Sequence, residues 1–535
     1  MKILLVIPRY NLTNKADYSY IFPIGLGYIS AVLKKEGYNV DCLNLNHYNG
    51  AIKELVEKKL DEKKYDFVGT GNNALGYAIT EKIINAAKNH KSKPKFILGG
   101  PIITSEPEAV FKLLNPDFAV IGEGEETIIE LLDCIEKNKS LKEIQGIGFR
   151  SKNGNIIFTE RRKPIEDLDS IPWPDLEGLE FEKQLKNLSG HGLYLYQGFD
   201  YPRPYAVLGS RGCPFICTFC YHEGKYRQRT IDSLMKEIEF NVKKYRINII
   251  MLYDDCFSID KRRMYEFCNR MKELKKQISW ELKWTSQLTV QNVDDEMLRM
   301  MKESGGDTIS YGFESFSDEV LKSMKKPITS EMISNAFYKT LKAKIGIQAN
   351  FIFGDAAETK ETAYKTLDWW KKNSRGQIRL GFIQPYPGSE IYRHCLRKGI
   401  IKDKEDFIKN RLSTENWYNM TDKMSDDEIK KLKMDILDAK SKYYTYIYPI
   451  SMKKTGKERY EFKVKCPFCN KINIYRNCEI KNKYTYDYGL ICRECHMFFK
   501  PVSLIKKIAY KYQPQLRILR DYQLKMSKFL KKSKM

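Results

Sequence analysis

The chain has 535 residues, of which 42% are hydrophobic and 30% charged, and this composition excludes a disordered protein. No apolar run is long enough to span a bilayer, and the apolar start at Ile3–Pro8 is too short for a secretory signal. We therefore expect a cytoplasmic protein without a transmembrane segment. The net charge of +24 is concentrated in residues 451–535, which hold 22 Lys and Arg against 6 Asp and Glu, so any argument for a polyanionic partner applies to that end.

Residues 1–140 alternate between short apolar runs and helical patterns. The apolar runs are Ile3–Pro8, Val40–Asn46, Phe67–Gly71, Phe96–Gly100 and Phe118–Gly122. The helical patterns between them are Gly25–Lys35, Ala51–Lys64, Ala78–Lys91, Glu106–Leu114 and Glu126–Lys137. Because parallel neighbours need crossover connections, this alternation predicts an α/β domain with a doubly wound parallel sheet.

Glycines mark the predicted carboxyl ends of several of these strands, where ligands of such sheets bind. They are Gly69, Gly71, Gly99, Gly100, Gly122 and Gly124, the last two within Gly122-Glu123-Gly124-Glu125. Glycine permits a close approach between backbone and ligand, although ordinary strand-to-helix turns explain the pattern equally well.

Residues 141–200 form a predicted connection between two domains. Asn153-Gly154 is a turn sequence between the predicted strands Gly148–Lys152 and Asn155–Thr159, which indicates a hairpin. The proline-containing segment Lys163–Asp175 follows and predicts a linker.

Residues 201–400 alternate again, on a longer scale. The predicted strands are Ala206–Ser210, Ile249–Tyr253, Trp280–Trp284, Thr308–Phe313, Ile347–Phe353 and Ile378–Ile383. Six βα units are too few for a closed eight-unit barrel, so we expect an open, partial (βα)6 barrel of the TIM type. Residues 401–450 then form a helical segment around Asp426–Lys442.

Three cysteines, Cys213, Cys217 and Cys220, follow the first strand of this second unit within eight residues. Cysteine thiolates ligate iron–sulfur clusters, and a 4Fe–4S cluster requires four ligands. With three cysteines supplied, one iron keeps an open position for a substrate or cosubstrate. The position at a strand's carboxyl end, where barrel active sites lie, favours this interpretation over a chance grouping of buried thiols.

The spacing Cys213-x3-Cys217-x2-Cys220, with Phe219 before the last cysteine, resembles the signature of the radical S-adenosylmethionine (radical SAM) superfamily. Asp254-Asp255, Gly312-Phe313-Glu314-Ser315 and Gln384–Ser389 are similar to what that family carries after later strands. The first 140 residues resemble the cobalamin (B12)-binding domain that precedes the barrel in one large subgroup. Its supporting stretches are Pro23–Tyr28, Gly99-Gly100-Pro101 and Gly122–Thr127.

This resemblance implies a role for each matching residue. Cys213, Cys217 and Cys220 ligate three irons, and S-adenosylmethionine chelates the fourth through its amino and carboxylate groups. Phe219 lies near the adenine, the backbone around Tyr253–Asp255 meets the amino group, and Glu314 faces the ribose or the amino-acid end. Because Asp254 and Asp255 are adjacent on a strand, at most one faces the barrel interior. Gly99, Gly100, Gly122, Glu123, Gly124 and Glu125 belong to the implied cobalamin site.

Two departures from the family pattern stand out. Many cobalamin domains carry Asp-x-His-x-x-Gly after the first strand, but the segment Pro8–Phe22 contains no histidine. His47-Tyr48-Asn49-Gly50 resembles part of that pattern after the second strand, which we interpret as coincidence, so we expect cobalamin to bind without a protein histidine. Gly354–Thr359 replaces the Gly-x-Pro-Gly-Glu-Thr that relatives often carry, which weakens inferences about that loop.

The tail carries two further cysteine pairs, Cys466/Cys469 and Cys492/Cys495, separated by 22 residues. Such pairs place four thiolates around zinc, so residues 451–500 are predicted to form a zinc-ribbon-like module. Ile472–Tyr475 and Tyr484–Tyr488 are candidates for its hairpin. A rubredoxin-like iron, or an auxiliary iron–sulfur cluster with Cys478 as an extra ligand, is the alternative, and His496 is expected to be a bystander.

Residues 501–535 mix apolar residues with many Lys and Arg. A basic amphipathic helix can lie on an anionic membrane, which would make the protein peripheral to the membrane, or contact nucleic acid. A solvated, partly disordered end is the alternative.

The leading hypothesis is a cobalamin-dependent radical SAM enzyme that cleaves S-adenosylmethionine to a 5′-deoxyadenosyl radical and C-methylates an unactivated carbon. The substrate is a small molecule or a lipid, and the electron comes from a donor such as flavodoxin or ferredoxin. A ring-forming or rearrangement enzyme without methyl transfer is the alternative. A methylthiotransferase is disfavoured because only Cys42 and Cys134 precede Cys213, too few for a second cluster. A non-enzymatic zinc-ribbon protein that binds nucleic acid does not explain the Cys213 loop.

Overall fold

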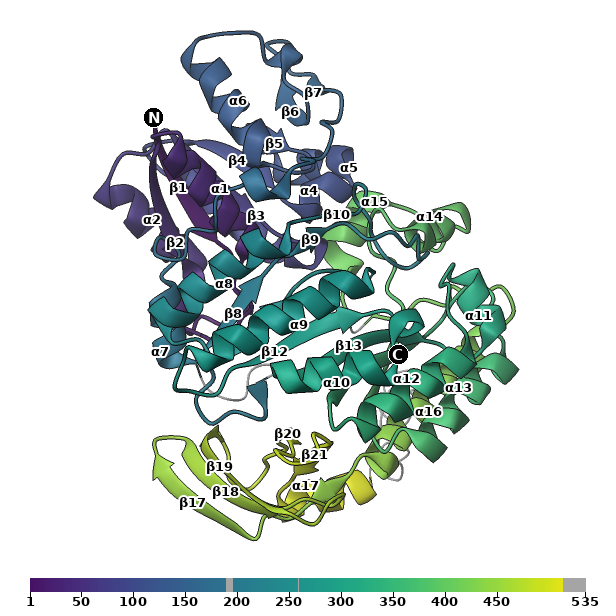
Figure 1. Cartoon of the computed structure of the whole chain (residues 1–535). Coiled ribbons are helices and arrows are strands. Elements are labelled where there is room, and N and C mark those ends of the chain that lie inside the picture. The colour runs from purple at the N-terminus through teal and green to yellow at the C-terminus, as the bar shows by residue number, and fades with distance from the viewer. Residues whose placement is uncertain (189–195, 258, 415, 513–535) are drawn as a thin grey trace, which may run out of the picture.

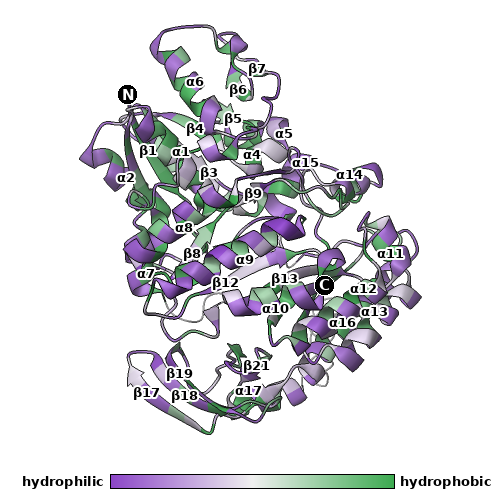
Figure 2. Cartoon of the chain, in the orientation of Figure 1, coloured by the Kyte–Doolittle hydropathy of each residue, from purple (hydrophilic) through white to green (hydrophobic). Residues whose placement is uncertain are grey.

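The computed structural model describes residues 1–188, 196–257, 259–414 and 416–512. Figure 1 shows three parts: an N-terminal α/β unit, a central α/β unit and a small C-terminal module. Figure 2 shows that strand β1 is hydrophobic whereas helix α9 is largely hydrophilic, as expected for buried strands covered by helices with one solvent-facing side.

The N-terminal sheet has the order β2-β1-β3-β4-β5-β6-β7. Its strands are β1 (Lys2–Ile7), β2 (Asn39–Asn44), β3 (Phe67–Gly71), β4 (Lys95–Gly99), β5 (Phe118–Val120), β6 (Ile147–Arg150) and β7 (Ile156–Phe158). Its helices are α1 (Ile24–Lys35), α2 (Ile52–Glu62), α3 (Tyr77–Asn89), α4 (Pro101–Ser105), α5 (Pro107–Leu114) and α6 (Glu125–Glu136). The first five strands are parallel, as predicted.

The predicted hairpin forms as β6 and β7, but it is part of the first sheet. β6 pairs antiparallel with β5, so the sheet continues past residue 140, where we expected the first domain to end. The physical reason is the exposed edge of the short strand β5, which a following hairpin covers by pairing with it. Helix α7 (Phe181–Asn187) then leads towards the central unit.

The central sheet has six parallel strands in chain order, β8-β11-β12-β13-β14-β15. They are β8 (Pro204–Val207), β11 (Ile249–Leu252), β12 (Lys283–Leu288), β13 (Gly306–Glu314), β14 (Gly346–Phe353) and β15 (Ile378–Phe382). The helices between them are α8 (Ile231–Tyr245), α9 (Lys261–Lys276), α10 (Asp295–Ser304), α11 (Asp318–Ser323), α12 (Ser330–Lys342) and α13 (Lys360–Asn373). Strand β12 begins three residues later than predicted, because Trp280 lies before the strand and donates its indole N–H to the Ile247 carbonyl at 2.8 Å.

Helices α14 (Glu390–Arg397), α15 (Lys404–Asp406) and α16 (Asp426–Tyr443) follow the central sheet. This region and the central unit share one buried core with the N-terminal unit. Val320 and Met324 of the central unit, and Ile391 and Phe407 of this region, lie in the same apolar cluster as Leu4 and Val68 of the first sheet. The two α/β units are therefore packed together through a common core.

The C-terminal module has two small sheets, β17-β18-β19 and β16-β21-β20. Its elements are β16 (Tyr446–Ile447), β17 (Ser451–Gly456), β18 (Arg459–Lys465), β19 (Ile472–Glu479), β20 (Leu490–Ile491), β21 (Phe498–Pro501) and α17 (Leu504–Lys511). The predicted hairpin of Ile472–Tyr475 with Tyr484–Tyr488 is wrong, because β19 pairs with β18 and β20 with β21. Each Cys-x-x-Cys segment is the turn of its own hairpin, and a tight turn joins the strands on either side of it.

Candidate functional site

The loop that carries Cys213, Cys217 and Cys220 leaves the central sheet after β8. Two short antiparallel strands, β9 (Ser210–Arg211) and β10 (Arg227–Gln228), join the two ends of this loop. Gly212 lies at its start with φ of +76°, and a Cβ there would lie 2.6 Å from the Lys225 carbonyl oxygen. Only glycine fits this position, so the loop begins at a residue with both steric and conformational constraints.

All three cysteines line one cavity of about 120 Å³, here called the cysteine cavity, together with Phe219, Asp255 and Glu314. Phe219, Asp255 and Glu314 are thus brought together with the thiols as the resemblance implied. The Tyr253 side chain is not among the lining residues, and its backbone N–H donates to the Val207 carbonyl at 2.9 Å. Five predicted site residues, three cysteines and two carboxylates, therefore line this cavity at the carboxyl ends of β8, β11 and β13.

Asp254 and Asp255 have different roles, as expected for neighbours in an extended segment. Asp254 is buried and accepts hydrogen bonds from the Gly209 N–H at 2.7 Å and the Ser210 hydroxyl at 2.6 Å. Burial raises its pKa to about 6. It fixes the turn that precedes the cysteine loop, whereas Asp255 faces the cysteine cavity, where burial raises its pKa.

Glu314 forms an ion pair with Lys326, a residue that the sequence reasoning missed. The Glu314 carboxylate lies 3.2 Å from Lys326 Nζ, and both side chains line the cysteine cavity. Glu314 has φ of +61°, a strained conformation for a residue with a side chain, next to a register shift in β13. No sequence signal marks Lys326, because it lies in the connection between α11 and α12 rather than at a strand end.

The three cysteine thiols of the loop are not grouped closely enough to hold a single metal ion in this conformation. Burial raises the pKa of each thiol, that of Cys220 to about 12, so metal binding must displace a proton from each. Among the described residues, these cysteines do not form a group whose ligand atoms all lie within 4.8 Å of one another. A multi-iron cluster needs a wider separation of thiolates than one ion does. The donor set therefore fits an iron–sulfur cluster.

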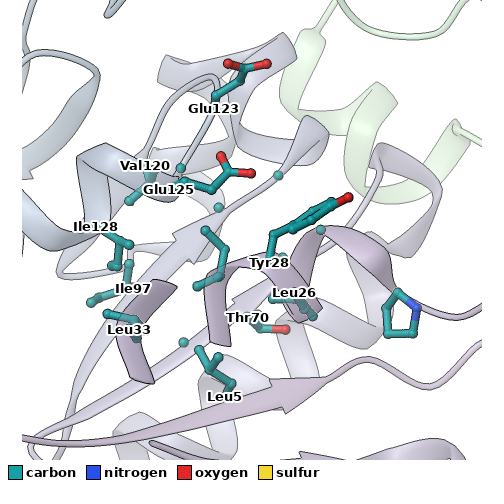
Figure 3. A pocket seen from close by; sticks show the side chains of 18 of the residues that line it. Leu5, Leu26, Tyr28, Leu33, Thr70, Ile97, Val120, Glu123, Glu125 and Ile128 are labelled. Atoms are coloured by element: carbon teal, nitrogen blue, oxygen red, sulfur yellow. The ribbon is translucent and has the colours of Figure 1, made fainter. Parts of the chain in front are cut away.

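The N-terminal unit contains a second cavity of about 400 Å³, here called the sheet cavity. Apolar side chains of the sheet, α1 and α6 line its interior, among them Leu5, Leu33, Ile97 and Ile128 (Figure 3). Covering an apolar wall removes it from water, which is favourable by about 25 cal/mol per Å² of apolar surface, so an apolar ligand gains free energy in this cavity. The sheet cavity therefore fits a bound ligand with a large apolar part.

The predicted glycines line the sheet cavity at the carboxyl ends of the strands. Gly69, Gly71, Gly99, Gly100, Gly122 and Gly124 all belong to its wall. Gly100 has φ of +83°, and a Cβ there would lie 3.0 Å from the Asn72 backbone. Glycine is thus required for this close packing of two strand ends beside the cavity.

Glu123 and Glu125 also line the sheet cavity (Figure 3). Their carboxylates pair with arginines of the central unit. Arg211 lies 2.5 Å from Glu125, and Arg227 forms two hydrogen bonds with Glu123 at 2.9 and 3.0 Å. Burial by itself raises the pKa of Glu123, but Arg227 and Arg211 outweigh it and lower the pKa overall. These ion pairs join the mouth of the sheet cavity to the base of the cysteine loop.

The four tail cysteines form a separate site, here called the tail cluster. Cys466, Cys469, Cys492 and Cys495 each offer a sulfur within 4.8 Å of the others, while Cys478 lies outside this group. His496 is turned away: its Nδ1 lies 3.2 Å from Asp307 and its Nε2 lies 2.9 Å from Lys302. Four thiols at such short separations fit one tetrahedral metal ion.

The C-terminal module covers the amino-terminal end of the central sheet. Asp200, just before β8, pairs with Arg493 at 2.6 Å, and Asp307 in β13 pairs with His496. Gln377, just before β15, exchanges two hydrogen bonds with the Phe498 backbone at 2.7 and 3.0 Å. The tail cluster and the cysteine cavity therefore lie at opposite ends of the central strands.

Within the described residues, no helix is long and apolar enough to cross a membrane. Helix α17 covers Leu504–Lys511 of the predicted basic amphipathic segment, and Leu504, Ile505 and Ile508 are exposed on it. The rest of that predicted segment, residues 513–535, lies outside the described part of the chain.

Comparison with known proteins gives two family matches. Residues 207–369 match the radical SAM superfamily, and residues 14–132 match the B12 binding domain. The predicted resemblance to both is confirmed.

Among curated proteins, the chain is 29% identical over 445 residues to an uncharacterized methyltransferase of Pyrococcus horikoshii. This alignment covers 81% of this chain and 88% of the relative. It is 25% identical over 421 residues to the anaerobic magnesium-protoporphyrin IX monomethyl ester cyclase of Rubrivivax gelatinosus, covering 76% and 72%. Among solved structures, the radical S-adenosylmethionine methyltransferase TsrM from Kitasatospora setae aligns with a TM-score of 0.59 at 16% identity, over 74% of this chain and 77% of that one. At this identity the structural match establishes the fold.

Proposed function

We propose that this chain, which combines a B12-binding domain with a radical SAM domain, is a cobalamin-dependent enzyme that methylates an unactivated carbon of a small molecule or lipid. In this proposal the central unit is a partial (βα)6 barrel and the C-terminal module is a zinc ribbon. The observation that carries the proposal is the meeting of the two cavities: Arg211 lines the sheet cavity, and Cys213, two residues later, lines the cysteine cavity.

The cysteine cavity fits a cluster and S-adenosylmethionine. Cys213, Cys217 and Cys220 would hold three irons. The amine and carboxylate of S-adenosylmethionine would bind the open iron, so the amine N–H groups need acceptors and the carboxylate needs a cation nearby. Asp255 and Glu314 supply carboxylate acceptors and Lys326 supplies the cation on the cavity wall, and Phe219 offers an aromatic face for the adenine.

The sheet cavity fits the part of cobalamin that a B12-binding domain holds, because its interior is apolar and its rim consists of glycines at strand ends. When bound, the cluster supplies the electron that cleaves S-adenosylmethionine, and cobalamin carries the methyl group to be transferred. The chain orients both groups at one junction and excludes water from it. A flavodoxin or ferredoxin is proposed as the electron donor.

A ring-forming reaction is the second candidate. The similarity to the anaerobic cyclase of Rubrivivax gelatinosus favours it, because that relative also aligns over most of both chains. The two candidates share the cluster, S-adenosylmethionine and cobalamin sites and differ in what happens to the substrate radical.

Anaerobic reconstitution with a chemical reductant tests the proposal. The wild-type chain should convert S-adenosylmethionine to 5′-deoxyadenosine or S-adenosylhomocysteine and contain iron, cobalt and zinc. Cys213→Ala should lose at least 90% of this turnover and most of the iron but keep the zinc, whereas Cys466→Ser should lose the zinc and keep the iron. Cys268→Ala, a buried cysteine of α9 outside the cavity, is the matched control. Full turnover by Cys213→Ala would contradict the ligand assignment.

A further inference from the structure

Helix α17 (Leu504–Lys511) presents its apolar side chains to solvent. Leu504 is 62% exposed, Ile505 54% and Ile508 49%, and Tyr512, directly after the helix, is 46% exposed. At about 100° of rotation per residue, these four positions fall within one arc of about 100°, here called the apolar face of α17. An amphipathic helix of a globular protein normally turns such a face towards the core. An exposed apolar face of this kind marks a surface for a partner.

The C-terminal module fixes α17 in this orientation. At the start of the helix, the Ser503 N–H donates to the Tyr486 carbonyl at 3.1 Å. Tyr510 lies nearly opposite the apolar face on the helix circumference. It stacks on Tyr446 with ring centroids 4.6 Å apart and donates its hydroxyl to Asp487. Because these contacts hold the inner side of the helix, the apolar face points away from the module.

Three lysines belong to the same helix. Lys507 and Lys511 lie directly beside the apolar face on the helix circumference, and Lys506 lies farther round. Lys507 Nζ is 4.2 Å from the ring centroid of Tyr448, which is itself exposed. In the described part of the chain, each of the three lysines lies over an aromatic ring and none forms an ion pair. The stem of such a lysine covers apolar surface while its ammonium group reaches the rim.

The charge of the whole module agrees with that of the helix. Residues 451–512 contain 15 Lys and Arg against 5 Asp and Glu, and residues 513–535, which follow α17 in the sequence, add 7 against 1. The module therefore contains too few carboxylates to neutralise its own cations, however they are paired. A partner with complementary charge must be anionic.

The side chains of the apolar face distinguish between classes of anionic partner. Single-stranded nucleic acid is held by cations together with aromatic rings on which its bases stack. Leu504, Ile505 and Ile508 are aliphatic and offer no such stacking surface. A lipid bilayer with anionic headgroups presents negative charge above an apolar layer, and a helix with an apolar face bordered by lysines binds at that boundary. The bilayer surface matches both properties of α17.

We propose that α17 docks the protein on the surface of an anionic bilayer. Leu504, Ile505 and Ile508 enter the boundary between headgroups and acyl chains, and the lysines contact the headgroups. Figure 1 shows the C-terminal module at the end of the molecule away from the N-terminal unit, so docking does not involve the junction of the sheet and cysteine cavities. The proposal goes beyond the proposed function and does not depend on it, because neither the cluster nor cobalamin takes part.

Sedimentation of the full-length protein with lipid vesicles tests this docking. The anionic vesicles contain phosphatidylcholine and phosphatidylserine in a ratio of about two to one, and the control vesicles contain phosphatidylcholine alone. We expect at least tenfold tighter binding to the anionic vesicles, and this preference should shrink as the salt concentration rises.

Variants of the apolar face locate the binding. Ile508→Glu places a carboxylate near the centre of the face, so it should weaken binding to anionic vesicles at least tenfold and leave the unfolding midpoint unchanged, whereas Ile508→Leu should bind normally. Met332→Glu, at an exposed apolar position of α12 in the central unit, adds the same charge and is the matched control. It should bind like the wild type. If Ile508→Glu does not fold, Ile505→Glu replaces it in the comparison.

Four results would overturn the proposal. The first is binding to anionic vesicles that is absent or no tighter than to phosphatidylcholine alone. The second is wild-type affinity in the folded Ile508→Glu protein, which would assign membrane binding to other segments, such as residues 513–535. The third is a dimer in solution that Ile508→Glu dissociates, without vesicle binding, which would make a second copy of the chain the partner. The fourth is binding of a single-stranded oligonucleotide that Ile508→Glu abolishes while vesicles do not bind.

Discussion

His47 is held on both sides of its ring by protein groups. Its Nε2 lies 2.8 Å from the Tyr20 hydroxyl, its Nδ1 lies 3.1 Å from Glu180, and Tyr18 stacks on the ring. The side chain is fully buried. With both nitrogens engaged, His47 in this conformation offers no ligand to a metal. The binding of cobalamin without a protein histidine stays a prediction.

Glu180 provides a pH-dependent test of this network. Burial alone raises its pKa, but hydrogen bonds from His47 and Lys183 outweigh burial and lower the pKa to about 2. A lowered pKa means that the carboxylate stabilises the fold above its ordinary value near 4.5 and that this contribution disappears as the pH falls towards 2. Glu180→Gln should therefore lower the free energy of unfolding by about 1–3 kcal/mol at pH 7 and by much less at pH 3, as measured by thermal unfolding.

Glu182→Gln is the control for this comparison, since Glu182 forms only an exposed pair with Lys186 on the same helix. Glu182→Gln should change the unfolding midpoint far less than Glu180→Gln at pH 7, because exposed ion pairs contribute little to stability. Equal losses in the two variants, or a loss in Glu180→Gln that does not shrink at pH 3, would contradict the role given to Glu180.

Single residues also explain which site residues the sequence did not reveal. Cys213, Cys217, Cys220 and Glu314 follow strands at recognisable positions, so spacing predicted where they lie. Lys326 follows no strand, and its contact with Glu314 depends on how the α11–α12 connection folds back over the cavity. Such a contact between segments is a tertiary property that local pattern does not encode.

Among the elements, the cysteine loop depends on its β9–β10 base. Gly212→Ala should open this base, because the added Cβ meets the Lys225 carbonyl at 2.6 Å and the backbone has positive φ. We expect the reconstituted variant to contain less than half of the wild-type iron. Gly154→Ala is the matched control: Gly154 has φ of +82°, but nothing lies within 4 Å of the added Cβ. Wild-type iron content in Gly212→Ala would show that the cysteine loop does not need its β9–β10 base.

The sheet cavity can be filled without disturbing the strands that surround it. At Gly99 an added Cβ has Val120 as its nearest neighbour, at 3.9 Å. Gly99→Leu should therefore place a side chain in the cavity and lower cobalamin affinity at least tenfold in a titration, while the unfolding midpoint stays close to that of the wild type because the added Cβ meets no close neighbour. Unchanged cobalamin affinity in a folded Gly99→Leu protein would show that cobalamin does not bind in this cavity.

Element types were predicted best where the pattern was long and regular. Five strands and five helices of the N-terminal unit lie where the sequence placed them, because alternating apolar runs and amphipathic helices leave few alternatives. The tail hairpin was mispaired because the prediction placed both of its strands between the two cysteine pairs, whereas β18 precedes Cys466 and β21 follows Cys495. In β12 the apolar Trp280 shifted the predicted strand by three residues, which also obscured Gln287, another residue of the cysteine cavity.

At the scale of the whole molecule, a different unit packs against each of the two ends of the central sheet. The carboxyl ends of the central strands face the N-terminal unit through the Glu123 and Glu125 ion pairs, and the amino ends face the C-terminal module through Asp200, Asp307 and Gln377. The sequence predicted each unit but not this docking, because ion pairs between units leave no periodic signal. The arrangement places the proposed chemistry at one junction and the tail metal site at the other.

The most direct test of the central claim is the electron paramagnetic resonance spectrum of the reduced, reconstituted protein, recorded before and after S-adenosylmethionine is added. Three cysteine ligands leave one iron for the cosubstrate, so the spectrum should change on addition, and Cys213→Ala should lack the signal. A spectrum that stays the same at saturating S-adenosylmethionine, or a cluster signal that persists in Cys213→Ala, would contradict the account.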